Sequence, residues 1–374
     1  MTDPPSTDGG EEVATQDDVE LLASEGLAAW LVDQQVSLVF GTPPAKLWLL
    51  GVDDDGRLAV FDRSLDKVMG VASDRNERLW VATRYEVWRF ENVLVPGTRT
   101  DLGHDRLFVP RLMSTVGNVN IHDVGVEADG RDLWVNTRFG CLASTSDTAN
   151  FEPRWHPPFL DGPRPGDRCH LNGLAMVDGV ASYVTCVSQS TEVDGWRAGR
   201  RDQGVVIDVT TDEVVARGLS MPHSPRWRDG RLWVANAGTG ELGTIDLDRG
   251  AFEPVAFGPG FLRGLCFVGD YAVVGSSKPR RGDIYSGLAL DDALEAHGME
   301  PHLGFFVIDL RSGELVHWLL VEGPVRELFD VCALPGVRRP AAIGLVGGEV
   351  RSDLWFDDAL PLADGAGLGR VESR

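Results

Sequence analysis

Three histidines have the residue type and the spacing from which a metal centre can be built. His122, His170 and His223 each begin a short apolar run, and roughly fifty residues, one propeller repeat, separate each from the next. Because the first strands of propeller blades line one central channel, we expect the three imidazoles to meet at its mouth. Three imidazoles suit a transition metal and leave positions open for water, oxygen or substrate. The sequence therefore predicts one divalent metal here, Fe first, then Cu, Zn or Mn.

Polar side chains on the same predicted strands would complete this centre. Asp123 would orient an imidazole or complete the coordination, and Asn172 and Asp330 would add oxygen atoms from the same channel. Arg263 would hold a carboxylate or a phosphate as a bidentate partner. The predicted catalytic residues are Arg263, Asp123 and Asp330, and the predicted substrate-binding residues are Asn172, Arg226, Arg197 and Lys278.

Two of these residues lie in polar segments that interrupt the repeats. Residues 188–203 contain Trp196 and Arg197, and residues 278–302 begin with Lys278 and include an expected short helix near residues 291–297. Long insertions on a rigid scaffold often form lids or binding loops. The alternative is that both segments are solvated surface decoration.

The elements that would position the site repeat along the chain. Leu79-Trp80-Val81, Leu133-Trp134-Val135 and Leu232-Trp233-Val234 are copies of one aromatic strand, each near a turn that contains Gly or Asp. A shorter strand precedes each copy. First strands are expected near residues 37, 69, 122, 171, 223, 263 and 329. The pattern predicts an all-β fold, a single propeller of seven blades, with six blades or a β-sandwich plus a second domain as alternatives.

The rest of the chain divides by composition. Residues 1–18 are rich in Asp, Glu, Ser, Thr and Pro, which predicts a disordered acidic tail. Residues 19–35 place apolar side chains near helical spacing, which predicts an N-terminal helix. The propeller would span residues 36–350, and residues 351–374 would form a C-terminal extension.

Composition excludes several classes of partner. The 374 residues contain 35 Lys and Arg against 57 Asp and Glu, a formal charge of −22, so a nucleic-acid partner is not expected. No apolar stretch is long enough to cross a membrane, and no signal peptide is evident. The 5 cysteines contain no CxxC pair, which favours reduced thiols and a cytoplasmic protein. The oligomeric state stays open.

Several motifs together resemble a known family. They are Cys169-His170-Leu171-Asn172-Gly173-Leu174-Ala175-Met176, Ser220-Met221-Pro222-His223-Ser224-Pro225-Arg226-Trp227, Gly238-Thr239-Gly240-Glu241-Leu242-Gly243 and Phe261-Leu262-Arg263-Gly264-Leu265. They are similar to a bacterial family of conserved propeller domains of unknown function, over roughly residues 30–350. The resemblance implies one globular unit and no particular activity. A looser likeness is to propeller metalloenzymes such as the carotenoid-cleaving oxygenases, which hold iron on four axial histidines; three can be placed here.

These observations lead to one principal hypothesis and two alternatives. The principal hypothesis is a metal-dependent enzyme that acts on a small anionic molecule or peptide, an oxidoreductase of the oxygenase type before a hydrolase or lyase. The first alternative is a non-catalytic propeller that serves as a binding module. The second is a metal-free lyase or hydrolase that uses channel histidine and arginine residues.

Overall fold

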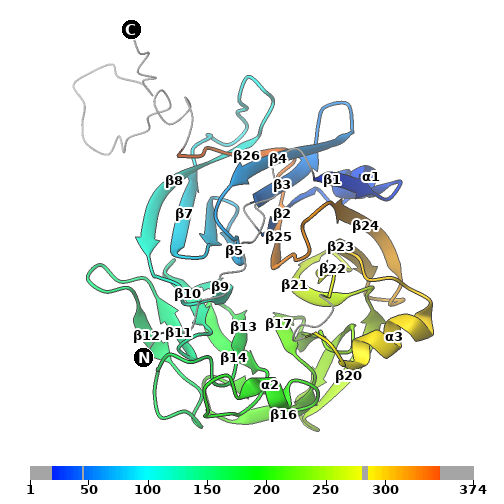
Figure 1. The fold of residues 1–374 in the computed structure, drawn as a ribbon. Coiled ribbons are helices and arrows are strands. Elements are labelled where there is room, and N and C mark those ends of the chain that lie inside the picture. The colour runs from blue at the N-terminus through cyan, green and yellow to red at the C-terminus, as the bar shows by residue number, and fades with distance from the viewer. Residues whose placement is uncertain (1–18, 44–45, 280–284, 346–374) are drawn as a thin grey trace, which may run out of the picture.

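The fold is a ring of six β-sheets around a central channel. The computed structural model describes residues 19–43, 46–279 and 285–345. Four sheets have four strands and two have five, and within each blade the chain pairs successive strands antiparallel. Figure 1 looks down the channel, with strands β5, β9, β13, β17, β21 and β25 innermost. The predicted all-β propeller is confirmed.

Each blade runs from an inner strand at the channel to an outer strand at the rim. The first contains β25 (Asp330–Pro335), β2 (Val36–Thr42), β3 (Lys46–Val52) and β4 (Leu58–Ser64); the second contains β5 (Gly70–Asp74), β6 (Arg78–Ala82), β7 (Glu86–Asn92), β8 (Arg106–Thr115) and the added parallel strand β26 (Pro340–Ala342). The third contains β9 (Ile121–Val126), β10 (Asp132–Asn136), β11 (Cys141–Ser144) and β12 (Glu152–Trp155); the fourth contains β13 (Leu171–Val177), β14 (Val180–Cys186), β15 (Gly204–Asp208) and β16 (Val214–Leu219). The fifth contains β17 (Pro222–Arg228), β18 (Arg231–Asn236), β19 (Glu241–Asp246) and β20 (Ala251–Phe257); the sixth contains β21 (Phe261–Val268), β22 (Tyr271–Ser277), β23 (Gly304–Asp309), β24 (Leu315–Glu322) and β1 (Glu20–Ala23).

The prediction of seven blades was wrong, because two of the seven predicted first strands belong to one blade. The strand near residue 37 is β2, and it pairs antiparallel with β25, so that Val36 faces Pro335 and Gly41 faces Asp330. The C-terminal strand therefore supplies the inner edge of the first blade and closes the ring. The sequence pattern counted this blade twice, once for β2 and once for β25, because the two strands lie near opposite ends of the described chain.

The repeated aromatic strands form the contacts between blades. In β6, Leu79 and Val81 pack against the first blade, whereas Trp80 and Ala82 pack against the third. Successive side chains of a strand point to opposite faces of its sheet, so a strand that is apolar throughout fits between two neighbouring blades. The Leu-Trp-Val repeat is thus the core of the ring.

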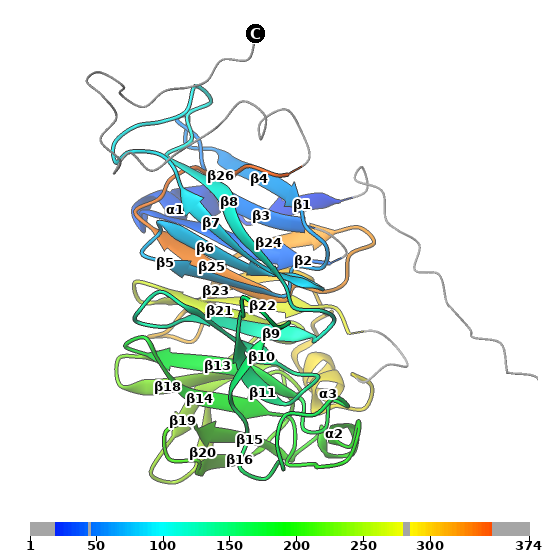
Figure 2. The ribbon, with the colours of Figure 1, turned by 90° about the vertical axis from the view of Figure 1, so that its left-hand side faces the viewer.

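Three short helices complete the described structure. The predicted helix over residues 19–35 is shorter than expected: α1 spans Leu27–Asp33, and β1 precedes it as an outer strand paired with β24. Helices α2 (Trp196–Gly199) and α3 (Ala289–His297) come from the two polar insertions and lie on one face of the ring (Figure 2). In the described part of the chain, no helix is long and apolar enough to cross a membrane. The predicted tail and the predicted C-terminal extension lie outside the described residues.

Candidate functional site

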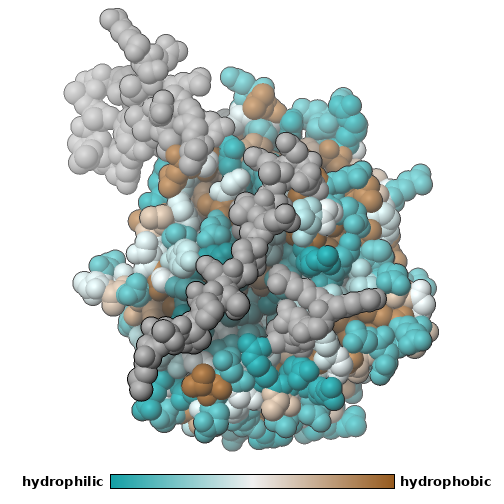
Figure 3. Space-filling view, in the orientation of Figure 1, coloured by the Kyte–Doolittle hydropathy of each residue, from teal (hydrophilic) through white to brown (hydrophobic). Residues whose placement is uncertain are grey.

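The three histidines meet at one mouth of the channel, on the face that carries α2 and α3. The ring centroids of His122 and His170 are 4.9 Å apart, and those of His122 and His223 are 6.5 Å apart. His170 and His223 are buried, only 6% and 4% exposed. We call the set of His122, His170, His223, Asn172 and Arg263 the imidazole mouth. Around the centre of this face the described surface is mainly hydrophilic (Figure 3).

The strand register shows which of these positions are equivalent. The residues just before His122, Asn172 and His223 pair with the last residues of the neighbouring second strands, Asn136, Cys186 and Asn236. Asn172 therefore holds in the fourth blade the place that a histidine holds in the third and fifth. His170 comes two residues earlier, before β13 begins, in the left-handed region with φ 50°. The sequence placed the three histidines together but did not show this offset.

Each imidazole has one ring nitrogen fixed by a hydrogen-bond acceptor. Nδ1 of His122 lies 2.9 Å from the carbonyl oxygen of Asn120, and Nδ1 of His223 lies 2.8 Å from that of Met221. Nδ1 of His170 lies 2.8 Å from a carboxylate oxygen of Asp167. An acceptor opposite Nδ1 places the proton there and leaves Nε2 as a lone pair. No described residue hydrogen-bonds to these Nε2 atoms, and that of His223 is fully buried.

The surroundings keep two of these rings neutral. Burial lowers the pKa of His122 well below its usual range, and the nearby His170 and Arg263 lower it further. Burial also lowers the pKa of His223 well below its usual range, with Arg263 as the next largest cause. Neutral imidazoles can accept a proton or a metal ion through Nε2.

Arg263 is a buried cation without an anionic partner in the described structure. It is 6% exposed, and its guanidinium lies over the ring of Phe329, 4.3 Å from the centroid. Its Nη1 atom is buried and makes no hydrogen bond with the described residues. Its positive charge lowers the pKa of both His122 and His223.

The insertion at residues 188–203 supplies one wall of the mouth. Trp196 in α2 is buried and stacks on His170, with ring centroids 4.2 Å apart. Unlike the channel residues, Arg197 is half exposed. Its guanidinium lies 4.7 Å from the centroid of the Trp196 ring and 3.5 Å from a carboxylate oxygen of Asp194. Lys278 directly follows β22, and its Nζ atom lies 3.0 Å from a carboxylate oxygen of Glu322. Neither of these two predicted substrate-binding residues makes a described contact with the imidazoles.

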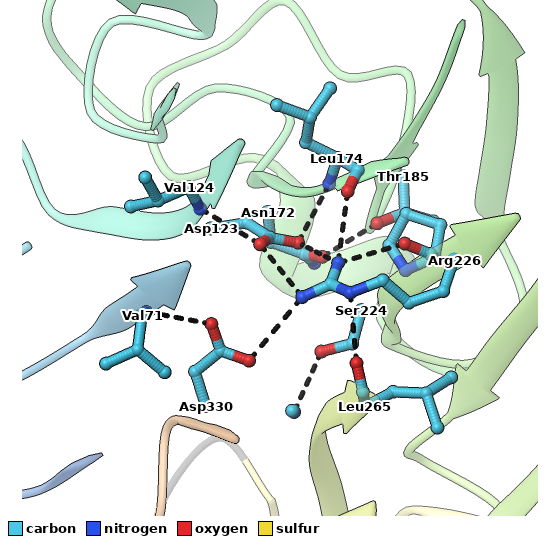
Figure 4. A network of polar contacts seen from close by, with 12 residues as sticks. Val71, Asp123, Val124, Asn172, Leu174, Thr185, Ser224, Arg226, Leu265 and Asp330 are labelled. Atoms are coloured by element: carbon cyan, nitrogen blue, oxygen red, sulfur yellow. Dashed lines mark hydrogen bonds and ion pairs between the residues drawn. The ribbon is translucent and has the colours of Figure 1, made fainter. Parts of the chain in front are cut away.

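Deeper in the channel, three of the predicted site residues form ion pairs and hydrogen bonds with one another (Figure 4). We call Asp123, Arg226 and Asp330 the arginine layer. Arg226 holds Asp123 through two contacts of 2.7 and 3.1 Å and approaches Asp330 at 3.5 Å. It also donates to the carbonyl oxygens of Leu174, Pro225 and Leu265. Beyond this layer lies a cavity of about 290 Å³, lined by later residues of the inner strands.

The carboxylates of the arginine layer also accept backbone N–H groups. Asp123 accepts those of Val124 and Leu174, and Asp330 accepts those of Val71 and Val331. Asp123 therefore contacts Arg226 and the backbone, and no imidazole. Burial raises the pKa of Asp330 to about 7, because Arg226 offsets only part of the desolvation and Asp123 adds repulsion. Burial opposes the charge of Arg226, but the two carboxylates outweigh it and raise its pKa.

Sequence reasoning missed two residues that touch the imidazoles. Asp167 lies in the loop before β13 with φ 45°, and one of its carboxylate oxygens is buried without a described partner. Thr137 places its hydroxyl 2.8 Å from Nδ1 of His122 and donates to the carbonyl oxygen of Leu171. Asp167 comes three residues before His170, and this local spacing is the one signal that would have found it.

The geometry for a metal ion is only partly present. Metal-binding histidines usually donate the second ring nitrogen to a carbonyl or carboxylate, and all three rings show this pattern. As the side chains stand, however, no three His, Cys, Asp or Glu residues of the described ranges form a group that could hold one ion. The rings would have to move closer together to share it.

Comparison with known proteins identifies the family and the fold. A family model described as a domain of unknown function, DUF4915, matches residues 25–343. The chain belongs to the DUF4915 family. The predicted resemblance to a family of unknown function is thereby confirmed, whereas a likeness to propeller metalloenzymes is not shown. No match to a curated protein was found.

The solved structures similar to this DUF4915 chain match it at low sequence identity. A chain of a nidogen/laminin complex has a TM-score of 0.50 and 11% identity, and the match covers 81% of this chain and 99% of that chain. A protein of unknown function from Bacteroides caccae has a TM-score of 0.44 and 13% identity, with 80% and 98% covered. At such identity the first of these shows the fold alone.

Proposed function

We propose that this protein is an enzyme that acts on a small anionic molecule at the imidazole mouth by acid–base chemistry. The observation that carries the proposal is the common state of the three histidines: each Nδ1 faces an acceptor, and each Nε2 lacks a described partner. A purely structural histidine in a buried site normally has both nitrogens satisfied, whereas the buried Nε2 of His223 has no described partner. Three lone pairs beside a buried guanidinium favour a ligand with both a negative charge and a proton to give.

His170 is the best placed general base of the three. Asp167 accepts its Nδ1–H at 2.8 Å, and Trp196 stacks on its ring, so both the tautomer and the ring plane are fixed. Nε2 would take a proton from a hydroxyl group or a water molecule, and the Asp167 carboxylate would stabilise the imidazolium. The imidazolium would then return that proton to the leaving group or product.

A metal ion on His122, His170 and His223 is the second candidate. The hydrogen bonds at Nδ1 favour it, because such bonds orient metal-binding imidazoles in other proteins. A bound ion, Fe before Cu, Zn or Mn, would polarise a carbonyl group or activate water or oxygen. Asp167 would hold the His170 ring, and Arg263 would bind the anionic part of the substrate.

Elemental analysis separates the two candidates. We expect the purified, untagged protein to hold well below one equivalent of Fe, Cu, Zn or Mn, also after incubation with each ion. About one equivalent in the native protein, lost in His122→Ala, His170→Ala and His223→Ala, would establish the metal centre and overturn the metal-free proposal.

A substrate screen tests for catalysis itself. The protein is incubated with a mixture of small anionic metabolites, and mass spectrometry follows the composition over time. We expect a component to be consumed by the native protein and left intact by His170→Gln, which retains a polar side chain of similar reach. A component that binds to both the native protein and His170→Gln, and that neither protein converts, would contradict the proposal and support a binding module.

A further inference from the structure

Two buried hydrogen-bond donors of the imidazole mouth lack described partners. Nη1 of Arg263 is one, and Nδ2 of Asn172 is the other; Asn172 is 1% exposed. The hydroxyl of Thr185 donates to Oδ1 of Asn172 at 2.8 Å, which directs the amide N–H₂ away from Thr185. Buried donors without acceptors are costly, so both point to a ligand that supplies acceptor oxygens.

Arg226 shows that an arginine in this channel can be fully paired. It contacts two carboxylates and three carbonyl oxygens, whereas Arg263 has an aromatic ring beneath it and no described carboxylate. A buried charge is normally compensated by an opposite charge. An anion that does not belong to the described residues would supply the partner that Arg263 lacks among them.

The two donors belong to corresponding positions of inner strands that flank the strand of His223. Asn172 and Arg263 lie at the irregular steps in the pairing of β13 and β21, and His223 lies at the corresponding step in β17, the strand between them. Nε2 of His223 is buried and unpartnered, and burial with Arg263 nearby keeps the ring neutral. The subsite thus offers two donors for an anion and, next to them, an acceptor for a hydroxyl group.

From this arrangement we propose that Arg263 and Asn172 bind the carboxylate of a 2-hydroxycarboxylate, whose hydroxyl group donates to Nε2 of His223. The inference rests on the proposed function, since it names the class of the anionic substrate. A guanidinium and an amide supply N–H donors to a planar carboxylate. The adjacent hydroxyl group satisfies the imidazole, which a carboxylate alone would leave unpartnered.

Other anions fit the subsite less well. A phosphate group brings three acceptor oxygens and up to two charges, but the neighbouring Nε2 atoms are acceptors and cannot donate to them. A 2-aminocarboxylate would place an ammonium group beside the Arg263 guanidinium, where like charges repel. One guanidinium with one neutral amide suits a single negative charge.

Calorimetric titrations with lactate, propionate and inorganic phosphate test the inference on the full-length protein. We expect lactate to bind about five- to tenfold more tightly than propionate, the effect of one hydrogen bond, and more tightly than phosphate. Arg263→Met should weaken lactate binding by about ten- to a hundredfold. Arg231→Met removes an exposed cation on β18 and should leave lactate binding unchanged.

His223→Phe isolates the hydroxyl contact. The variant should bind lactate and propionate equally, because it lacks the acceptor for the hydroxyl group. Equal affinities in the native protein, tighter phosphate binding, or lactate binding that survives Arg263→Met would each overturn the inference. If a substrate is converted in a His170-dependent way but lactate does not bind, the proposed subsite is wrong and the proposed enzyme stands. If lactate binds in an Arg263-dependent way but nothing is converted, the proposed enzyme is wrong and the subsite stands.

Discussion

Two arginines of one channel, a single layer apart, differ in what surrounds them. Arg226 lies between Asp123 and Asp330 and also bonds to three backbone carbonyl oxygens. Arg263 is less exposed than Arg226, at 6% against 21% for the Arg226 side chain, but it has only the Phe329 ring and an unpartnered Nη1 among the described residues. The arginine layer is thus complete without any ligand, and the imidazole mouth is not. Burial alone does not mark a functional residue; an unmet hydrogen-bonding requirement in a buried group does.

The largest effect should come from breaking the arginine layer. Arg226→Met leaves two buried carboxylates without their cation, which we expect to reduce the free energy of unfolding by about 3–5 kcal/mol. Chemical denaturation followed by tryptophan fluorescence measures it. A loss of unfolding free energy below about 1 kcal/mol would show that the ion pairs of Arg226 with Asp123 and Asp330 do not stabilise the contact between blades.

The next largest loss of unfolding free energy should come from a side chain added next to Asp330 of the same layer. Gly264 has φ 74°, and a Cβ atom there would lie 2.7 Å from Cα of Asp330 and from the backbone nitrogen of Val331. Gly264→Ala should therefore cost about 2–4 kcal/mol of unfolding free energy. Gly218→Ala is the matched control, because Gly218 has φ 82° and open space around its Cβ position. If both variants lose the same amount, the backbone angle and not the close approach of the two blades sets the cost.

The arginine layer should also make stability depend on pH. The pKa of Asp330 is raised to about 7 in the folded chain, above its ordinary value in the unfolded chain. Between these two values the folded state binds the extra proton, so stability falls as the pH rises, by about 2 kcal/mol from pH 5 to pH 7. The pH dependence of the native protein, less that of Asp330→Asn, isolates this contribution. A difference that rises with pH would contradict the assignment.

The smallest effect on stability is expected where the comparison is most direct. Arg263→Met removes a buried cation that has no described carboxylate to leave behind, so we expect the unfolding free energy to stay within about 1 kcal/mol of the native value, or to increase. The same denaturation measurement applies. A loss of unfolding free energy as large as that of Arg226→Met would mean that Arg263 stabilises the fold, and would contradict a ligand-binding role for it.

The sequence predicted much of the architecture and the neighbourhood of the site. Repeated first strands placed His122, His170 and His223 at one mouth, because the beginnings of successive inner strands meet at the axis. The pairing of Arg226 with Asp123 and Asp330 was not foreseen, since it depends on which side chains reach across the channel. The role of Asp167 was equally hidden, because it arises from a loop whose left-handed backbone turns the carboxylate towards His170.

The closure of the ring by β25 also has a consequence for how the chain acquires its fold. In the other five blades the four inner strands follow one another along the chain, but the pairing of Val36 with Pro335 joins segments near the two ends of the described chain. Such non-local pairings slow folding, because the loop must close before the contact forms. During synthesis β2 must wait for β25, which also brings Asp330 to Arg226. The arginine layer beneath the imidazole mouth therefore cannot be complete until β25 has been made.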